Sequence, residues 1–139
     1  MTELDHPVGD PAWRFRGFRT HPETIDNQRD FLTVAASLAA RSAHPGAPDL
    51  HRVALWNSRG AKDVVAFEEH GDAGFGGNLS LHEGGPVPAL VGTAALFAAR
   101  GWNVPDPLGP VAAEWAGEGA FVYFCGWGGA ARAALRFGG

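Results

Sequence analysis

The stretch FEEHGDAGFGGNLSLHEGG, residues 67–85, holds two histidines and four acidic residues among glycines, the residue types of metal and phosphate sites. His70 and His82 fall at opposite ends of a predicted strand. At about 3.3 Å per residue they lie roughly 30–40 Å apart, too far to share one ion. Phosphate loops require a helix N-terminus after their glycines, whereas these glycines lead into a strand. The stretch therefore predicts a polar hairpin, with no metal or cofactor.

Length and composition favour one globular domain. The chain has 139 residues, of which 45% are hydrophobic and 19% charged, and its formal net charge is −4. This acidity argues against a protein that binds nucleic acid by neutralising phosphates, so we expect no nucleic-acid partner. The single cysteine, Cys125, rules out an intrachain disulfide and fits the cytoplasm. No leader-like or membrane-spanning stretch is evident, so we expect no membrane association.

The pattern of apolar residues divides the chain into segments. Residues 1–12 are polar and contain prolines, which predicts a flexible arm, and residues 13–139 form the single domain. Helices are predicted over residues 22–42, with Thr20 and Glu23 as a capping box, and over 88–100. Strands are predicted over 13–19, 51–58, 62–69 and 73–81, followed by a hairpin over 111–127 that turns at residues 117–119. The tail, residues 130–137, fits either a helix or a strand.

This order, (β)αβββαββ(α/β), predicts an α+β fold with a mainly antiparallel sheet of five or six strands and two main helices packed on one face. If residues 13–19 form a strand, two strand–helix–strand–strand repeats result, as in small ligand-binding proteins with a groove between halves. If they do not, and the tail is helical, the order resembles that of type III secretion chaperones. Neither resemblance extends to a sequence motif, so no family follows.

One predicted sheet face is more apolar than a solvent-facing side should be. Pairing the strands across the turn at residues 58–61 brings together Val53, Leu55 and Ala66, followed by Asn78 and Ser80, with His51 and Glu68 at one end. Glycines within the third strand add the signal of a close approach by another group. This face is predicted to be a partner interface or a shallow ligand groove.

Four further features are candidates for binding or catalytic sites. Arg14 and Arg16 alternate with aromatic residues, a composition common in protein interfaces and also in an edge strand with its arginines outward. Trp102 follows a helix end and is expected to be partly exposed. Cys125 lies between apolar neighbours and is expected to be buried rather than nucleophilic. The terminal Gly138–Gly139 resembles the tail of ubiquitin-like proteins, but only this tail matches.

These features predict a non-enzymatic cytoplasmic protein-binding module, of the immunity, inhibitor or dedicated-chaperone kind, which binds another protein or forms a homodimer. The alternative is a small-molecule pocket, or a small enzyme of secondary metabolism, in which His51 and Glu68 orient the ligand. A third hypothesis is a nucleic-acid contact through Arg14 and Arg16.

Overall fold

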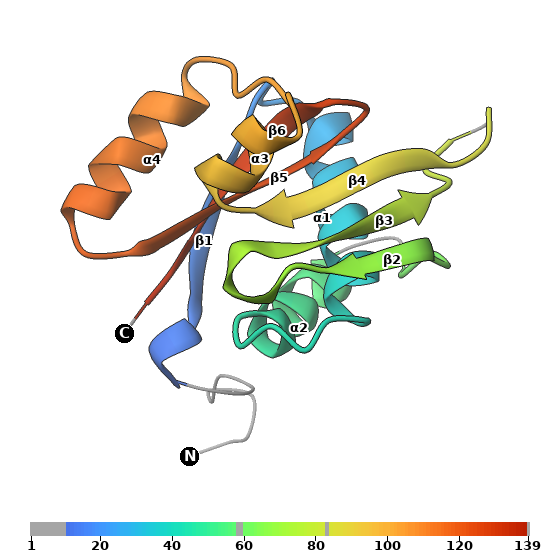
Figure 1. The fold of residues 1–139 in the computed structure, drawn as a ribbon, viewed down its shortest axis with the longest axis horizontal. Helices are drawn as coiled ribbons and strands as arrows, with labels where there is room; N and C mark the ends of the chain where they lie inside the picture. Colours follow the sequence, from blue (N-terminus) through green and yellow to red (C-terminus); the bar gives the residue numbers. More distant parts are fainter. Residues whose placement is uncertain (1–10, 58–59, 83, 139) are drawn as a thin grey trace.

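The structure, a computed structural model, describes residues 11–57, 60–82 and 84–138. The predicted flexible arm, residues 1–12, lies almost wholly outside the described residues. Six strands form one antiparallel sheet in the order β1-β6-β5-β4-β3-β2 (Figure 1). The predicted α+β class with a mainly antiparallel sheet is confirmed. The strands are β1 (Phe15–Thr20), β2 (Val65–Glu69), β3 (Gly74–Leu79), β4 (Val87–Gly92), β5 (Phe121–Trp127) and β6 (Ala130–Phe137).

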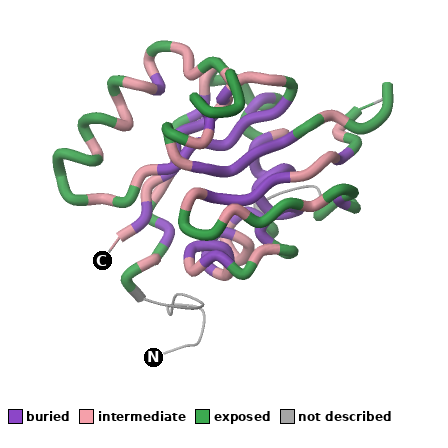
Figure 2. The backbone as a smooth tube through the Cα atoms, viewed as in Figure 1, coloured by how far each residue is buried: buried purple, intermediate pink, exposed green. Residues whose placement is uncertain are grey.

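Four α-helices divide between the two faces of the sheet, where two helices on one face were expected. Helices α1 (Ile25–Ala39) and α2 (Ala47–Asn57) cover one face, and α3 (Ala94–Ala99) and α4 (Leu108–Gly117) lie on the other (Figure 1). Two hydrophobic cores result, one on each face. Figure 2 shows the burial concentrated along the central strands, while much of α4 stays exposed.

The first predicted helix is confirmed, with a different cap. Thr24 ends the preceding extended segment, and its hydroxyl accepts the backbone N–H of Asn27 at 3.1 Å. Thr20, the predicted cap, is instead the buried last residue of β1. A side-chain oxygen that accepts from the first turn satisfies an otherwise unpaired donor, and Thr24 stands directly before the helical stripe.

The predicted strand over residues 51–58 is wrong, because residues 51–57 belong to α2; residue 58 lies outside the described residues. Ala47, Leu50 and Ala54 are each about 1% exposed and recur at helical spacing, so the segment buries one stripe. Asp49, also fully buried, accepts the backbone N–H of Phe15 at 2.7 Å and so fixes the start of β1 to this helix. The alternation of apolar residues that includes Val53 and Leu55 resembles a strand pattern, but it is part of the longer helical pattern of α2.

Two further segments differ from their predictions. The predicted helix over residues 88–100 divides into β4 and the short α3, with Thr93 capping α3 through the N–H of Leu96. The predicted strand at the start of 111–127 belongs to α4. This helix packs Leu108 and, at helical spacing, Ala112 and Trp115 into the second core. Apolar runs this short are compatible with both the helical and the strand periodicity. Packing against neighbouring elements then decides which of the two forms.

The remaining strands agree better with the sequence. Residues 130–137 form β6, which settles the tail as a strand between β1 and β5. β1 is an edge strand, with Phe15 buried and Arg14, Arg16 and Arg19 exposed, as in the protective arrangement weighed above. Cys125 is free and fully buried, and burial raises the pKa of its thiol.

Glycine is required where β3 and β4 begin and end. At Gly74 the backbone has φ 139°, and a Cβ there would stand 2.0 Å from the carbonyl oxygen of Val91. At Gly92 a Cβ would stand 2.6 Å from the side chain of Leu96. The two glycines therefore hold the end of this strand pair and the start of α3 closer together than any side chain allows.

Gly74→Ala should destabilise the protein severely, by about 3 kcal/mol, because it adds both an overlap with backbone and an unfavourable φ. Gly117→Ala is the matched control, since Gly117 lies in α4 with open space around it. It should gain up to about 1 kcal/mol from helix propensity. Urea denaturation measures both. Equal effects of the two substitutions would contradict the close approach at Gly74.

Candidate functional site

A chain of hydrogen bonds centres on His44, in the loop between α1 and α2. The backbone N–H of Gly46 donates to Nδ1 of His44 at 3.0 Å, so Nδ1 carries no proton and the neutral ring is protonated at Nε2. Nε2 lies 2.9 Å from the hydroxyl oxygen of Tyr123 and donates to it. The Tyr123 hydroxyl in turn donates to the backbone carbonyl of Asp72. Three segments that are far apart in sequence are thereby joined.

Burial fixes the protonation of this chain. His44 is only 4% exposed, and desolvation lowers its pKa, against smaller opposing effects of the Asp72 backbone and of Asp72 and Glu69. Burial also raises the pKa of Tyr123 to about 12. Both groups therefore stay neutral near neutral pH. His44 serves here as a fixed polar ring rather than as a cation.

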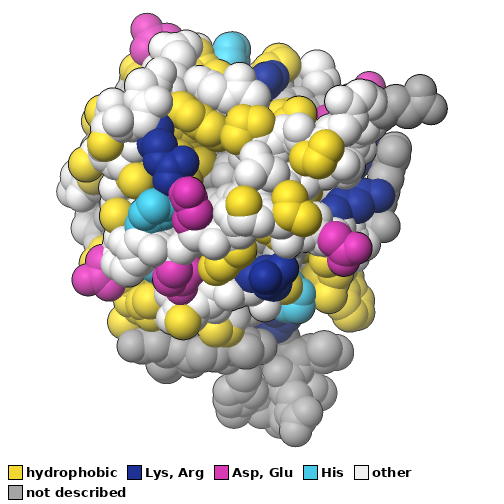
Figure 3. Space-filling model, turned by 45° about the vertical axis from the view of Figure 1, so that its right-hand side comes forward, with side chains coloured by type: hydrophobic (Ala, Val, Ile, Leu, Met, Phe, Trp, Pro, Cys, Tyr) yellow, Lys and Arg dark blue, Asp and Glu magenta, His cyan; other side chains and the backbone are white. Residues whose placement is uncertain are grey.

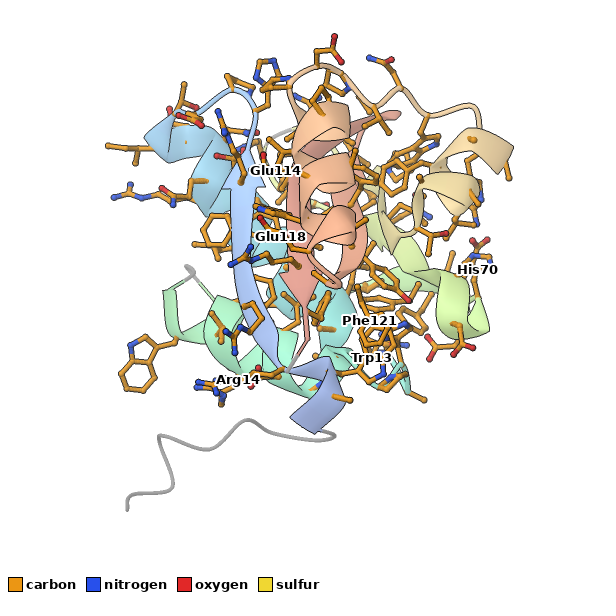
Figure 4. The ribbon with its side chains drawn as sticks, turned by 90° about the vertical axis from the view of Figure 1, so that its left-hand side faces the viewer. Trp13, Arg14, His70, Glu114, Glu118 and Phe121 are labelled. Carbon is orange, nitrogen blue, oxygen red and sulfur yellow. The ribbon has the colours of Figure 1, made fainter. Side chains whose placement is uncertain are left out.

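An aromatic cluster surrounds the imidazole at one end of the sheet. Trp13 stands edge-on to His44, with centroids 4.9 Å apart, and stacks on Phe121 at 4.4 Å. Tyr123 and Phe137 complete the group, each 5.8 Å from Trp13. Figure 4 shows Trp13 and Phe121 close together, beside the ends of the central strands. Phe121 is 44% exposed, so the stacked pair borders solvent and offers flat apolar surface there.

Small residues and one carboxylate position the loops around this cluster. A side chain at Gly46 would be crowded, because a Cβ there would stand 3.1 Å from Phe137 and 3.2 Å from Trp13. The Glu69 carboxylate accepts the Ser42 hydroxyl and the N–H of Ala43, which ties the end of β2 to the α1–α2 loop. Backbone and aromatic groups thus converge at this end of the molecule.

A charged group lies on the adjoining β2–β3 loop. Arg100, at the C-terminus of α3, donates to the carboxylate of Glu68, and its Nη2 lies 2.8 Å from Nε2 of His70. The same His70 nitrogen is 3.1 Å from Glu68. Hydrogen bonds from Arg100 and then His70 lower the pKa of Glu68, which is therefore ionised. We call Glu68, His70 and Arg100 the rim cluster.

The structure does not bring the sequence-predicted site residues to one surface. His51, Val53 and Leu55 lie on α2, so the predicted sheet face does not form. Ala66 is exposed at a bulge in β2, and beyond this bulge Glu69 pairs with Phe75. The other predicted members are Asn78, half-buried and paired with Val65 and Pro88, Ser80, exposed beyond β3, and Glu68, in the rim cluster.

The three remaining candidates are also scattered. Arg14 and Arg16 are exposed near the start of β1, and Arg16 lines a small polar cleft with Glu118 and Arg136. Trp102 is half-buried, as expected, and packs edge-on against Phe97 in the second core. A binding role for any one of these residues stays a prediction.

Sequence reasoning missed the residues that the fold does gather. His44 stood in a segment that was read only as the end of a helix, and Tyr123 is 79 positions further along the chain. Trp13 was noted only as part of the arginine-rich strand. A histidine followed by Pro45 and Gly46 between two helices was the available signal, since such a turn can hold its ring in place.

The rest of the described surface carries an apolar groove and small groups of charged side chains. An apolar groove beside α4 is lined by Ala112, Ala116, Val122 and Phe124 among others. On the face shown in Figure 3, basic and acidic side chains form small separate groups, with uncharged surface between them. Within residues 11–57, 60–82 and 84–138, no three His, Cys, Asp or Glu residues are grouped to hold a metal ion. No helix in this described part is both long and apolar enough to cross a membrane.

The fold is similar to that of solved domains from metal-transporting ATPases. The N-domain of HMA6, a copper-transporting P-type ATPase, has a TM-score of 0.66 at 16% identity, over 89% of this chain and 96% of that domain. The N-domain of HMA8, also from a copper-transporting P-type ATPase, gives 0.65 at 16%, over 88% and 97%. A zinc-transporting PIB-type ATPase gives 0.66 at 14%, and the match spans only 18% of that longer chain. No protein-family model and no curated protein sequence matches the chain.

These neighbours overturn the predicted function. The chain shares its fold with N-domains of metal-transporting P-type ATPases, and this likeness contradicts the predicted standalone protein-binding module. The prediction failed because it depended on an apolar sheet face made partly of residues 51–58. Residues 51–57 are helical, and helices cover both faces of the sheet.

The neutral state of His44 predicts a pH dependence of stability. Because its pKa is lowered in the folded protein, the unfolded chain binds a proton first as pH falls below about 6.5, and the free energy of unfolding declines. Urea denaturation between about pH 7.5 and 5 should show this decline in the native sequence and a shallower one in His44→Gln. An NMR titration giving His44 a pKa at or above the ordinary value would contradict the assignment.

Proposed function

We propose that this chain binds a single nucleotide, in the manner of an N-domain, with the base against the aromatic cluster of Trp13, His44 and Phe121. The observation that carries the proposal is this cluster of buried neutral imidazole and partly exposed stacked rings, in a fold shared with N-domains over nearly their whole length.

The chemistry of the cluster suits the flat base of a nucleotide. Flat apolar rings bind a base face through stacking, which contributes about 1–3 kcal/mol per base. Phe121 supplies a ring that already borders solvent, and Trp13 stacks behind it. The neutral His44 ring adds no charge beside the proposed base site, so a neutral base meets no unpaired charge from this ring.

The charge of the chain favours one nucleotide over a nucleic-acid strand. Binding to a strand gains most of its affinity from phosphate neutralisation, and the net charge here is −4. Basic side chains on the face in Figure 3 are dispersed rather than continuous. A single nucleotide needs only one base site and a local cationic contact.

This proposal retains the small-molecule alternative and moves its site from His51, on α2, to the aromatic cluster around His44. The cytoplasm remains our proposed compartment, supported by a lone buried cysteine. Neither protein binding nor a homodimer is part of the proposal.

Phe121→Ala should weaken ATP binding about tenfold, because it removes the exposed half of the stacked pair. Trp56→Ala is the matched control: Trp56 is 79% exposed on α2 and should leave the affinity unchanged. Isothermal titration calorimetry with ATP measures both, with thermal unfolding as a check of folding. Equal losses in the two variants, or no binding by the native protein, would refute the proposed site.

A further inference from the structure

We propose that Arg100 and His70 of the rim cluster bind the phosphates of the nucleotide, and that these contacts replace the ones both residues now make with Glu68. This assignment rests on the proposed function and adds to it the residues that hold the phosphates.

The rim cluster has too few acceptors for its donors. The nitrogen Nε2 of His70 lies 2.8 Å from Nη2 of Arg100, which is a donor, and 3.1 Å from a Glu68 oxygen, which is an acceptor. A neutral imidazole nitrogen either accepts or donates. If Nε2 of His70 accepts a hydrogen bond from Arg100, it carries no proton to donate to Glu68. If Nε2 is protonated, it cannot accept the N–H of the nearby Arg100 guanidinium. One carboxylate oxygen thus serves two competing groups.

An added anion would resolve this competition. A phosphate brings several strong acceptor oxygens, and an arginine fork matches them with two parallel N–H groups. Breaking the existing contacts costs little, because Glu68 and Arg100 are 50% and 35% exposed and solvent screens such ion pairs. His70 is less exposed, at 29%, but also reaches solvent.

The cluster lies at the border of the proposed base site. His70 precedes the turn η3 (Gly71–Ala73), and its backbone N–H donates to the carbonyl of Gly74 at 2.8 Å. Asp72, in this turn, accepts the hydroxyl of Tyr123 from the aromatic cluster. Figure 4 shows His70 on this loop, outward of Trp13 and Phe121. The phosphates of a base held at the aromatic cluster would therefore have the Arg100 guanidinium and the His70 ring as nearby polar partners.

Positions of the donors are fixed by the backbone. Thr93 caps α3 and its N–H donates to the carbonyl of Ala73, which joins the helix that carries Arg100 to the loop that carries His70. The close approach at Gly92 holds the same junction. The rim cluster is therefore built on a rigid connection between two elements and not on two independent loops.

The test compares adenosine, ADP and ATP by calorimetry on the full chain and three variants. Native protein should bind ATP and ADP more tightly than adenosine. Arg100→Gln should weaken ATP about tenfold and leave adenosine unchanged. Glu68→Gln should strengthen ATP, because it removes the competing and repelling carboxylate. Arg19→Gln, which breaks an exposed Arg–Glu pair on β1, is the control for a lost charge and should change neither ligand.

The outcomes separate the two proposals. Equal affinities of adenosine and ATP for the native protein, or an equal loss in Arg100→Gln and Arg19→Gln, would overturn the phosphate assignment and leave base binding intact. Weaker ATP binding by Glu68→Gln would also overturn it. Failure of all three ligands to bind the native protein would overturn both proposals. The substituted residues are exposed, and matching thermal unfolding curves confirm that the variants are folded.

Discussion

The hydrogen-bond chain from Gly46 through His44 and Tyr123 to Asp72 holds this end of the protein together. It connects the α1–α2 loop, the centre of β5 and the β2–β3 loop, which no run of neighbouring residues could join. Each buried polar group in it has a partner, and removing one would leave the others unsatisfied at a cost of about 1–3 kcal/mol each. The placement of Trp13, the edge of the sheet and the rim cluster all depend on this chain.

A second constraint is the close approach of backbones at glycine. Gly74 and Gly92 bring the ends of β3 and β4 against each other and against α3, while Gly46 admits the rings of Trp13 and Phe137. Side chains at these positions would push apart the loops that border the aromatic cluster. Helix pairs on both faces then cover the sheet, so the polar groups that remain accessible collect at the strand ends.

The sequence predicted the class of the fold better than its site. Elements with long or strongly patterned sequences, such as α1 and the strands containing Phe75 and Cys125, could be assigned from periodicity alone. Residues 47–57 and 108–117 could not be assigned in this way, because their short apolar runs are compatible with both helical and strand periodicity. Their helical conformation depends on packing against the rest of the core. The site could not be predicted from the sequence, because it is formed by tertiary contacts among Trp13, His44 and Tyr123. No local sequence pattern indicates these contacts.

An NMR titration of the uniformly ¹⁵N-labelled chain with ATP tests the central claim most directly. If a nucleotide binds at the aromatic cluster, the indole N–H of Trp13 and the amides of Gly46 and Gly74 will shift saturably, while those of α4, beside the apolar groove, stay in place. An absence of shifts at millimolar ATP, or shifts confined to α4, would contradict nucleotide binding at this end of the sheet.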